Sequence, residues 1–136
     1  MEIIKEDYVS LDTAKLLKNK GFDEPCLSYF WKDENDNQID YTDRPFTYKQ
    51  LYSGDILRPT HQMALKWLRE KHKIAINIRI VCKKTISYVF DVWDFNIIHP
   101  NKFVGGTIDL REQQFDFSSY EEATEEAIKY CLENLI

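Results

Sequence analysis

The feature that most constrains the fold is a stretch of strict alternation near the middle of the chain. From Ile74 to Cys82 every second residue is an isoleucine, except for the terminal cysteine, and this set points to one side. A period of two is typical of a half-buried strand. A second strand, Ile86 to Phe95, carries its own apolar set at Ile86, Tyr88, Phe90 and Val92. The two segments predict an antiparallel hairpin.

The register of this hairpin follows from its apolar sets, which must lie on the same face of the sheet. A three-residue loop, Lys83-Lys84-Thr85, satisfies this condition. A two-residue turn would shift the pairing by one residue and turn one apolar set towards water. The predicted pairs are Ile80 with Tyr88, Ile78 with Phe90 and Ile76 with Val92.

Three helices are predicted from the helical spacing of apolar residues between start and stop signals. They span about residues 11–20, 60–72 and 119–134. Ser10 is an N-cap residue for the first helix, and Gly21 supplies its left-handed stop. Pro59-Thr60 opens the second. Ser118 and Ser119 both have a glutamate three residues later, the capping-box spacing, so either serine is a candidate N-cap for the third.

The first 57 residues predict a smaller helix and hairpin. A strand over Cys26–Lys32 carries Leu27, Tyr29 and Trp31 on one side, and Gln38–Tyr41 is its return strand. The segment Asp43-Arg44-Pro45 is expected to break that strand. The interval 46–57 is ambiguous, because its aromatic spacing also fits one helical turn.

These elements predict an α+β fold. Its centre is an antiparallel sheet around hairpin 74–95, with helices 60–72 and 119–134 on the isoleucine face and a short third strand over 107–110. The N-terminal helix and hairpin complete it. No Gly-, Ser- or Pro-rich linker divides the chain, so we expect a single domain, 1–136, in which half 1–57 packs on half 58–136.

Composition and cysteine usage favour a cytoplasmic protein. The 136 residues are enough for an independent core, and neither a signal peptide nor a membrane span is expected. Three widely spaced cysteines are not a disulfide framework. Cys82 and Cys131 fall on apolar faces, so we expect both thiols to be buried and inert.

The charge is strongly segregated along the chain. Residues 58–84 contain eight basic side chains against Glu70 alone, a local charge of +7, whereas residues 107–136 carry −6. Such blocks either complement each other within the fold or across a dimer, or mark a binding surface.

The sequence contains no convincing catalytic or metal site, and we expect no enzyme activity and no cofactor. His61, His72 and His99 are far apart, and none pair at helical metal-site spacing. His61 in the first turn of a helix and His72 at its end are expected to be surface or capping residues. Asp91 and Asp94 lie three apart in a strand, on opposite faces, which excludes an acid–base couple. Asp91 is diagonal to Arg79, which predicts a cross-strand ion pair instead.

Parts of the chain resemble a group of short uncharacterised proteins of phages and prophages of gut bacteria. The resemblance rests on residues 59–70, 119–123 and 128–136, in the second and third predicted helices, together with the N-terminal capped helix, about half of the chain. It implies a mobile-element origin and an intracellular location. It implies no catalytic residue, cofactor or activity.

The element order from Thr60 onward is also that of a double-stranded-RNA-binding domain. An alternative role is therefore nucleic-acid binding through the basic region 58–84. The candidate contacts are Lys66, Arg69, Lys73, Lys83 and Lys84. Glutamates at the start of the last helix, Glu121 and Glu122, would repel a phosphate backbone, which makes this the second choice.

The favoured role is protein–protein interaction or self-association. Val89, Trp93 and Phe95 lie on the face of the hairpin opposite the isoleucines. An exposed patch of this kind is unusual for a soluble monomer, so we expect a cover. The candidates are the N-terminal half, a second copy of the chain as a homodimer, or an unknown protein partner.

Overall fold

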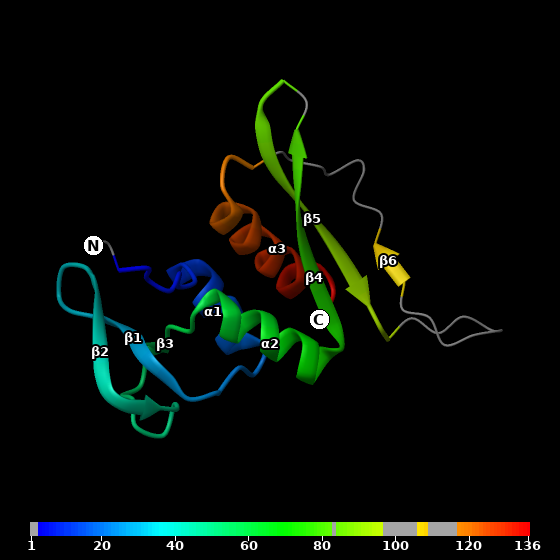
Figure 1. Ribbon diagram of the computed structural model, residues 1–136. Helices are drawn as coiled ribbons and strands as arrows, with labels where there is room; N and C mark the ends of the chain where they lie inside the picture. Colours follow the sequence, from blue (N-terminus) through cyan, green and yellow to red (C-terminus); the bar gives the residue numbers. More distant parts are fainter. Residues whose placement is uncertain (1–2, 83, 97–105, 109–116) are drawn as a thin grey trace. The chain divides into compact units, whose positions relative to one another are not determined.

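The computed structural model describes residues 3–82, 84–96, 106–108 and 117–136 (Figure 1). The chain forms two compact units, Met1–Ala64 and Leu65–Ile136. Their boundary lies within helix α2 (His61–His72), later in the chain than the division expected between residues 57 and 58. That the whole chain acts as one domain stays a prediction.

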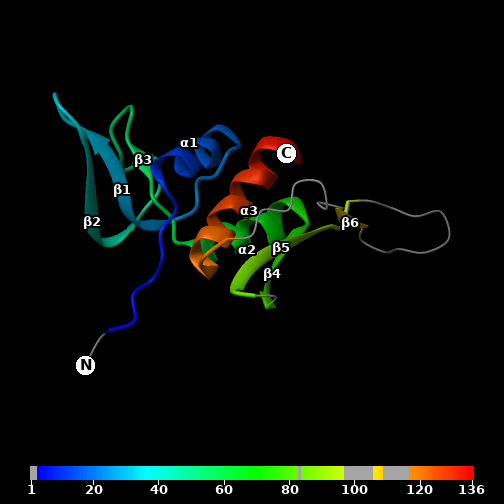
Figure 2. The ribbon, with the colours of Figure 1, turned by 90° about the horizontal axis from the view of Figure 1, so that it is seen from above.

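The first unit is a small helix-and-sheet structure. Helix α1 (Leu11–Asn19) begins at Ser10, whose hydroxyl accepts a hydrogen bond from the Thr13 amide at 3.3 Å, and Gly21 follows its end with φ of 92°. Strands β1 (Cys26–Lys32), β2 (Asn37–Phe46) and β3 (Ile56–Leu57) form an antiparallel sheet in the order β2-β1-β3 (Figure 2). Helix α1 lies against β3. The predicted helix cap and the first strand are confirmed.

One prediction about this unit's hairpin is wrong. Strand β2 continues through Asp43-Arg44-Pro45 because the register shifts opposite the Cys26–Ser28 segment, and proline is tolerated at such an irregularity. The buried face of β1 is that of Cys26, Ser28 and Phe30, whereas Leu27 is 51% exposed. Both faces of β1 carry apolar groups, so alternation alone did not identify the inner one.

Strand β3 was not predicted from the sequence. Its two residues are too few for a periodic signal, and they pair with Tyr29 and Phe30 of β1. The hydroxyl of Tyr48 accepts a hydrogen bond from the Leu57 amide at 3.1 Å, which holds the preceding loop to the strand. Burial raises the pKa of Tyr48 to about 12.

The second unit has the predicted hairpin at its centre. Strands β4 (Ile74–Cys82), β5 (Ile86–Asp94) and β6 (Gly106–Ile108) form an antiparallel sheet in the order β4-β5-β6. Ile80 pairs with Tyr88, and the three-residue loop is confirmed. The short third strand begins one residue earlier than expected, and Leu110 lies outside the described residues.

Helix α3 (Tyr120–Asn134) packs on β4 and β5. Its N-cap is Ser119, which accepts a hydrogen bond from the Glu122 amide at 3.1 Å, while the Ser118 hydroxyl donates to the Glu122 carboxylate. The rings of Phe90 and Tyr130 lie 6.1 Å apart, so the isoleucine face is the face that α3 covers. This confirms the α+β fold.

Helix α2 reaches the sheet at its C-terminal end. The side-chain amide of Asn96 donates to the His72 carbonyl at 2.7 Å, and the Phe95 amide donates to the Lys73 carbonyl at 2.9 Å. Trp67 and Leu68 are buried, as expected. In this unit the helix that contacts the strands of the sheet is α3, and no comparable contact of α2 with the isoleucine face is seen among the described residues.

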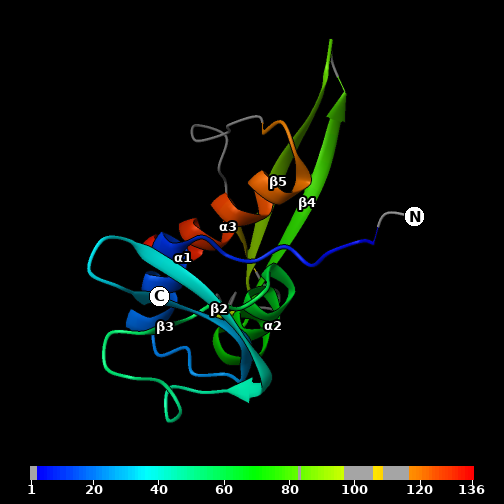
Figure 3. The same cartoon turned by 90° about the vertical axis from the view of Figure 1, so that its left-hand side faces the viewer.

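Burial along the isoleucine face falls steeply towards the hairpin loop. Ile74 is 1% exposed, Ile80 is 66% exposed and Cys82 is also exposed. The hairpin extends beyond the first turn of α3 (Figures 1 and 3). A nine-residue strand is about 30 Å long, whereas a fifteen-residue helix is about 22 Å long, so α3 cannot cover the whole face. The expectation that helices cover the isoleucine face therefore fails at Ile80, and the prediction that the Cys82 thiol is buried is wrong.

Candidate interaction surface

The three residues predicted as an interaction surface are Val89 and Trp93, on the face of β5 away from α3, and Phe95, directly after the strand. Val89 is only 4% exposed and does not belong to an open surface. Trp93 and Phe95 are 40% and 42% exposed. We call these two residues the aromatic surface. Whether the N-terminal half or another molecule covers them stays a prediction.

An ion pair occupies the middle of the same face. Arg79 donates two hydrogen bonds to the Asp91 carboxylate, one from Nε at 2.6 Å and one from Nη2 at 3.2 Å. These bonds and the negative charge of Asp91 raise the pKa of Arg79. The predicted cross-strand pair is confirmed. Because it neutralises the centre of this face, the aromatic surface is confined to the end of β5.

A second apolar surface lies on the opposite face, at the hairpin loop. Ile80 and Ile86 are 66% and 65% exposed, and Cys82 pairs with Ile86 across the strands. We call these three residues the tip surface. It was not predicted, because the alternation shows which side chains share a face but not how far a covering helix reaches. The relative lengths of strand and helix were the available signal.

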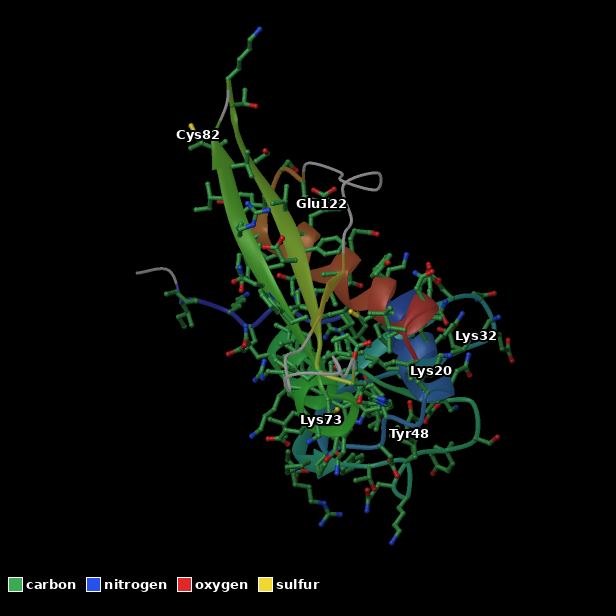
Figure 4. All side chains as sticks on the ribbon, turned by 90° about the vertical axis from the view of Figure 1, so that its right-hand side faces the viewer. Lys20, Lys32, Tyr48, Lys73, Cys82 and Glu122 are labelled. Carbon is green, nitrogen blue, oxygen red and sulfur yellow. The ribbon has the colours of Figure 1, made fainter. Side chains whose placement is uncertain are left out.

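The candidate nucleic-acid contacts do not form one cluster. Lys66, Arg69, Lys73 and Lys84 are exposed, and Lys83 lies outside the described residues. Lys73 is at the base of β4, whereas Cys82, two residues before Lys84, is near the far end of the hairpin (Figure 4). A strand about 30 Å long separates the two groups. Lys66 also pairs with Glu70 at 3.9 Å.

The histidines do not approach one another as metal ligands. His61 is 7% exposed, which corrects the expectation of a surface residue, and its amide donates to the Asp7 carbonyl at 2.8 Å. The ring of His72 contacts Trp67 at 4.5 Å, and partial burial lowers its pKa. His99 lies outside the described residues. Within the described ranges no three His, Cys, Asp or Glu side chains are grouped to hold a metal ion.

The buried cysteine thiols and the Asp94 carboxylate are held in environments that explain them as parts of the fold. Burial raises the pKa values of Cys26 and Cys131 to about 12, so these thiols stay protonated, as predicted for Cys131. Asp94 accepts hydrogen bonds from the backbone and side chain of Asn96 and does not face Asp91 as a catalytic partner. None of the helices among the described residues is long and apolar enough to cross a membrane.

Comparisons with known proteins add no relative. No model of a known protein family matches the chain, and no curated protein or solved structure does either.

Proposed function

We propose that the chain is a small non-catalytic protein of phage type that acts in the cytoplasm through protein–protein contact at its β4–β5 hairpin. The partner is another protein or a second copy of the chain. The observation that carries this proposal is the exposure of large apolar side chains on both faces of one hairpin, the tip surface and the aromatic surface. Apolar patches of this kind are typical of interaction sites.

The chemistry of the two surfaces supports a protein partner. Tryptophan and phenylalanine provide large contact areas and are enriched at the centres of protein interfaces. Ile80 and Ile86 add an aliphatic patch at the loop end of the hairpin, which extends beyond the first turn of α3 (Figure 3).

Nucleic-acid binding is the second candidate. It is supported by the exposed side chains of Arg69 and Lys84, which have no acidic partner among the described residues. The separation of the basic residues along β4 and the glutamates of α3 favour the protein partner instead.

The test is capture of binding partners from a lysate of a gut bacterium, with and without nuclease treatment. Three variants are compared with the wild type: Trp93→Ser with Phe95→Ser, Ile80→Thr with Ile86→Thr, and the control Tyr52→Ser. Tyr52 is 86% exposed and lies in the first unit, so its loss removes a large apolar group elsewhere.

We expect one defined protein, or the chain itself in a sedimentation measurement, to bind the wild type and the Tyr52 variant but not at least one hairpin variant. Capture that is unaffected by both hairpin variants would contradict the proposal. Loss of all binding on nuclease treatment would favour the nucleic-acid alternative.

A further inference from the structure

One edge of the second unit's sheet lacks the features that usually protect an edge strand. β4 is the outer strand, and its nine residues pair with β5 without a register shift. It contains no proline or glycine, and Arg79 is its only charged residue. Natural edge strands are commonly interrupted by proline, bulges or charged side chains, because unpaired backbone groups recruit other strands.

The sheet of the first unit shows the protection that β4 lacks. Its edge strand β2 contains Pro45, a register shift and three charged residues, Asp40, Asp43 and Arg44. In β4 the charge of Arg79 is held by Asp91 of β5 and does not guard the edge. Within one chain, the edge strand β2 is therefore protected against pairing with another strand, whereas β4 is open to it, as expected for a docking strand.

The hydrogen bonds of β5 identify the backbone groups of β4 that face outward. Tyr88 exchanges both backbone hydrogen bonds with Phe117, each at 2.9 Å, on the side away from β4. The pair Ile80–Tyr88 is therefore a non-hydrogen-bonded pair of the ladder. The Phe95 amide donates to the carbonyl of Lys73, which lies seven residues before Ile80. Because hydrogen-bonded and non-hydrogen-bonded pairs alternate, this odd separation also makes Ile80–Tyr88 a non-hydrogen-bonded pair.

The outward groups are consequently those of the isoleucines. The N–H and C=O groups of Ile76, Ile78 and Ile80 point away from β5, and no hydrogen bond to them is seen among the described residues. Those of Asn77 and Arg79 are used by the ladder. The edge thus presents a regular row of unpaired donors and acceptors beside the isoleucine side chains, which are half-buried at Ile76 and Ile78 and exposed at Ile80.

We propose that β4 is a docking edge for an extended acidic segment of a partner protein, which adds as a further strand alongside Ile76, Ile78 and Ile80. This inference rests on the proposed function and specifies the edge and the chemistry of the partner. Main-chain hydrogen bonds provide affinity in such strand addition, and alternate side chains provide specificity. On the face that α3 covers, apolar residues of the segment lie next to Ile78 and Ile80.

The acidic character of the segment follows from the charges at both ends of β4. Arg69, Lys71 and Lys73 precede the strand, and Lys84 follows it; all four side chains are exposed. Among the described residues Arg69, Lys71 and Lys84 have no acidic side chain within ion-pair distance. Acidic residues near both ends of an added strand would therefore be attracted to the basic side chains at each end of β4.

A second copy of β4 fits this edge less well. Two copies related by a two-fold axis pair antiparallel, and a centre at Ile78 uses the whole strand. That centre brings Lys84 of one copy beside Lys73 of the other. Like charges opposite one another destabilise strand pairing.

The test is a titration of the full ¹⁵N-labelled chain with a synthetic peptide of alternating valine and glutamate, followed by amide NMR signals. We expect saturable shifts that are larger at Ile76, Ile78 and Ile80 than at Ala75, Asn77 and Arg79. A peptide of alternating valine and lysine should bind at least about tenfold more weakly, because it meets like charge at both ends of the strand.

Two variants at one exposed position separate backbone docking from side-chain docking. Ile80→Pro removes an outward amide and should weaken binding at least about tenfold, while Ile80→Thr keeps that amide and should stay within about threefold of the wild type. The dispersion of the amide signals verifies the fold of each variant. If the proline variant is unfolded, Lys71→Glu with Lys84→Glu replaces it and should also lose binding.

Several outcomes would overturn the docking edge. These are the absence of saturable shifts, equal binding of the lysine peptide, and retained binding by a folded Ile80→Pro variant. A short DNA duplex that shifts the same signals when the acidic peptide does not would assign the region to nucleic acid. Loss of partner capture in the hairpin variants without peptide binding at β4 would overturn this inference and leave the proposed function standing.

Discussion

Lys73 joins α2 to β4 in a backbone conformation that side-chain-bearing residues rarely adopt. Its φ is +57°, in the left-handed region where helix ends usually carry glycine. The carbonyl of Lys73 accepts a hydrogen bond from the Phe95 amide, so this turn also fixes where the pairing of β4 with β5 begins. The position carries lysine instead of glycine, so the local sequence did not predict a positive φ here.

Lys73→Gly should therefore stabilise the protein by up to about 1 kcal/mol, because glycine adopts positive φ without the steric penalty of a side chain. The measurement is urea unfolding. Lys71→Gly is the matched control: it lies inside α2 and should destabilise by up to about 1 kcal/mol. A loss of stability in both variants would contradict the assigned role of Lys73.

His72 should make the stability depend on pH. Partial burial lowers its pKa in the folded protein below the ordinary value of 6.5, so below that pH the unfolded chain binds more protons. Stability from this residue is complete above pH 6.5 and is lost as the pH falls towards the folded-state pKa.

The variant His72→Gln should consequently lose less stability between neutral and mildly acidic pH than the wild type. Its stability at neutral pH should be lower, since the ring contact with Trp67 is removed. Urea unfolding at several pH values gives both quantities. Parallel pH profiles for the two proteins would show that His72 does not titrate in this way.

At the scale of the element, β4 has one alternating sequence pattern along its whole length, but its isoleucine face is buried at the start of the strand and exposed to solvent at the hairpin loop. Its alternation predicted the face and the register, and both are confirmed by the pairing with β5. The depth of burial was not contained in the pattern, because it depends on how far α3 extends along the strand.

Two matched truncations test this gradient. Ile74→Ala should destabilise by about 2–4 kcal/mol, because it empties a packed position, whereas Ile80→Ala should cost less than about 1 kcal/mol. Both substitutions remove the same atoms from the same face of one strand. Equal losses in urea unfolding would mean that the loop end of the hairpin is covered in solution.

At the scale of the whole molecule, α2 links the two compact units. Their boundary, between Ala64 and Leu65, lies inside this helix, so separating the units requires breaking helical hydrogen bonds. Ala64 is also completely buried. A shared helix of this kind favours cooperative unfolding.

Tryptophan fluorescence can follow each unit, since Trp31 belongs to the first and Trp67 to the second. Variants that keep only one of these tryptophans should each give a fluorescence midpoint in urea that coincides with the midpoint from circular dichroism. Two separate midpoints in either variant would show that the units unfold independently.

Local patterns in the sequence were sufficient for most of the elements, but not for strand β3 or for the end of β2. The cap of α1 at Ser10, the extent of β1, the β4–β5 register and the Arg79–Asp91 pair all depend on neighbours along the chain or directly across one ladder, and each is confirmed. The capping-box spacing narrowed the start of α3 to two serines, and hydrogen-bond geometry selected Ser119.

The surfaces were beyond the reach of such patterns. The inner face of β1, the burial of Val89 and the exposure of Ile80 and Cys82 depend on which distant segment covers each position. Alternation places side chains on a face, but burial is removal from water, and that requires atoms contributed from elsewhere in the chain. For the same reason the unpaired edge of β4 became visible only when its neighbours in the sheet were known.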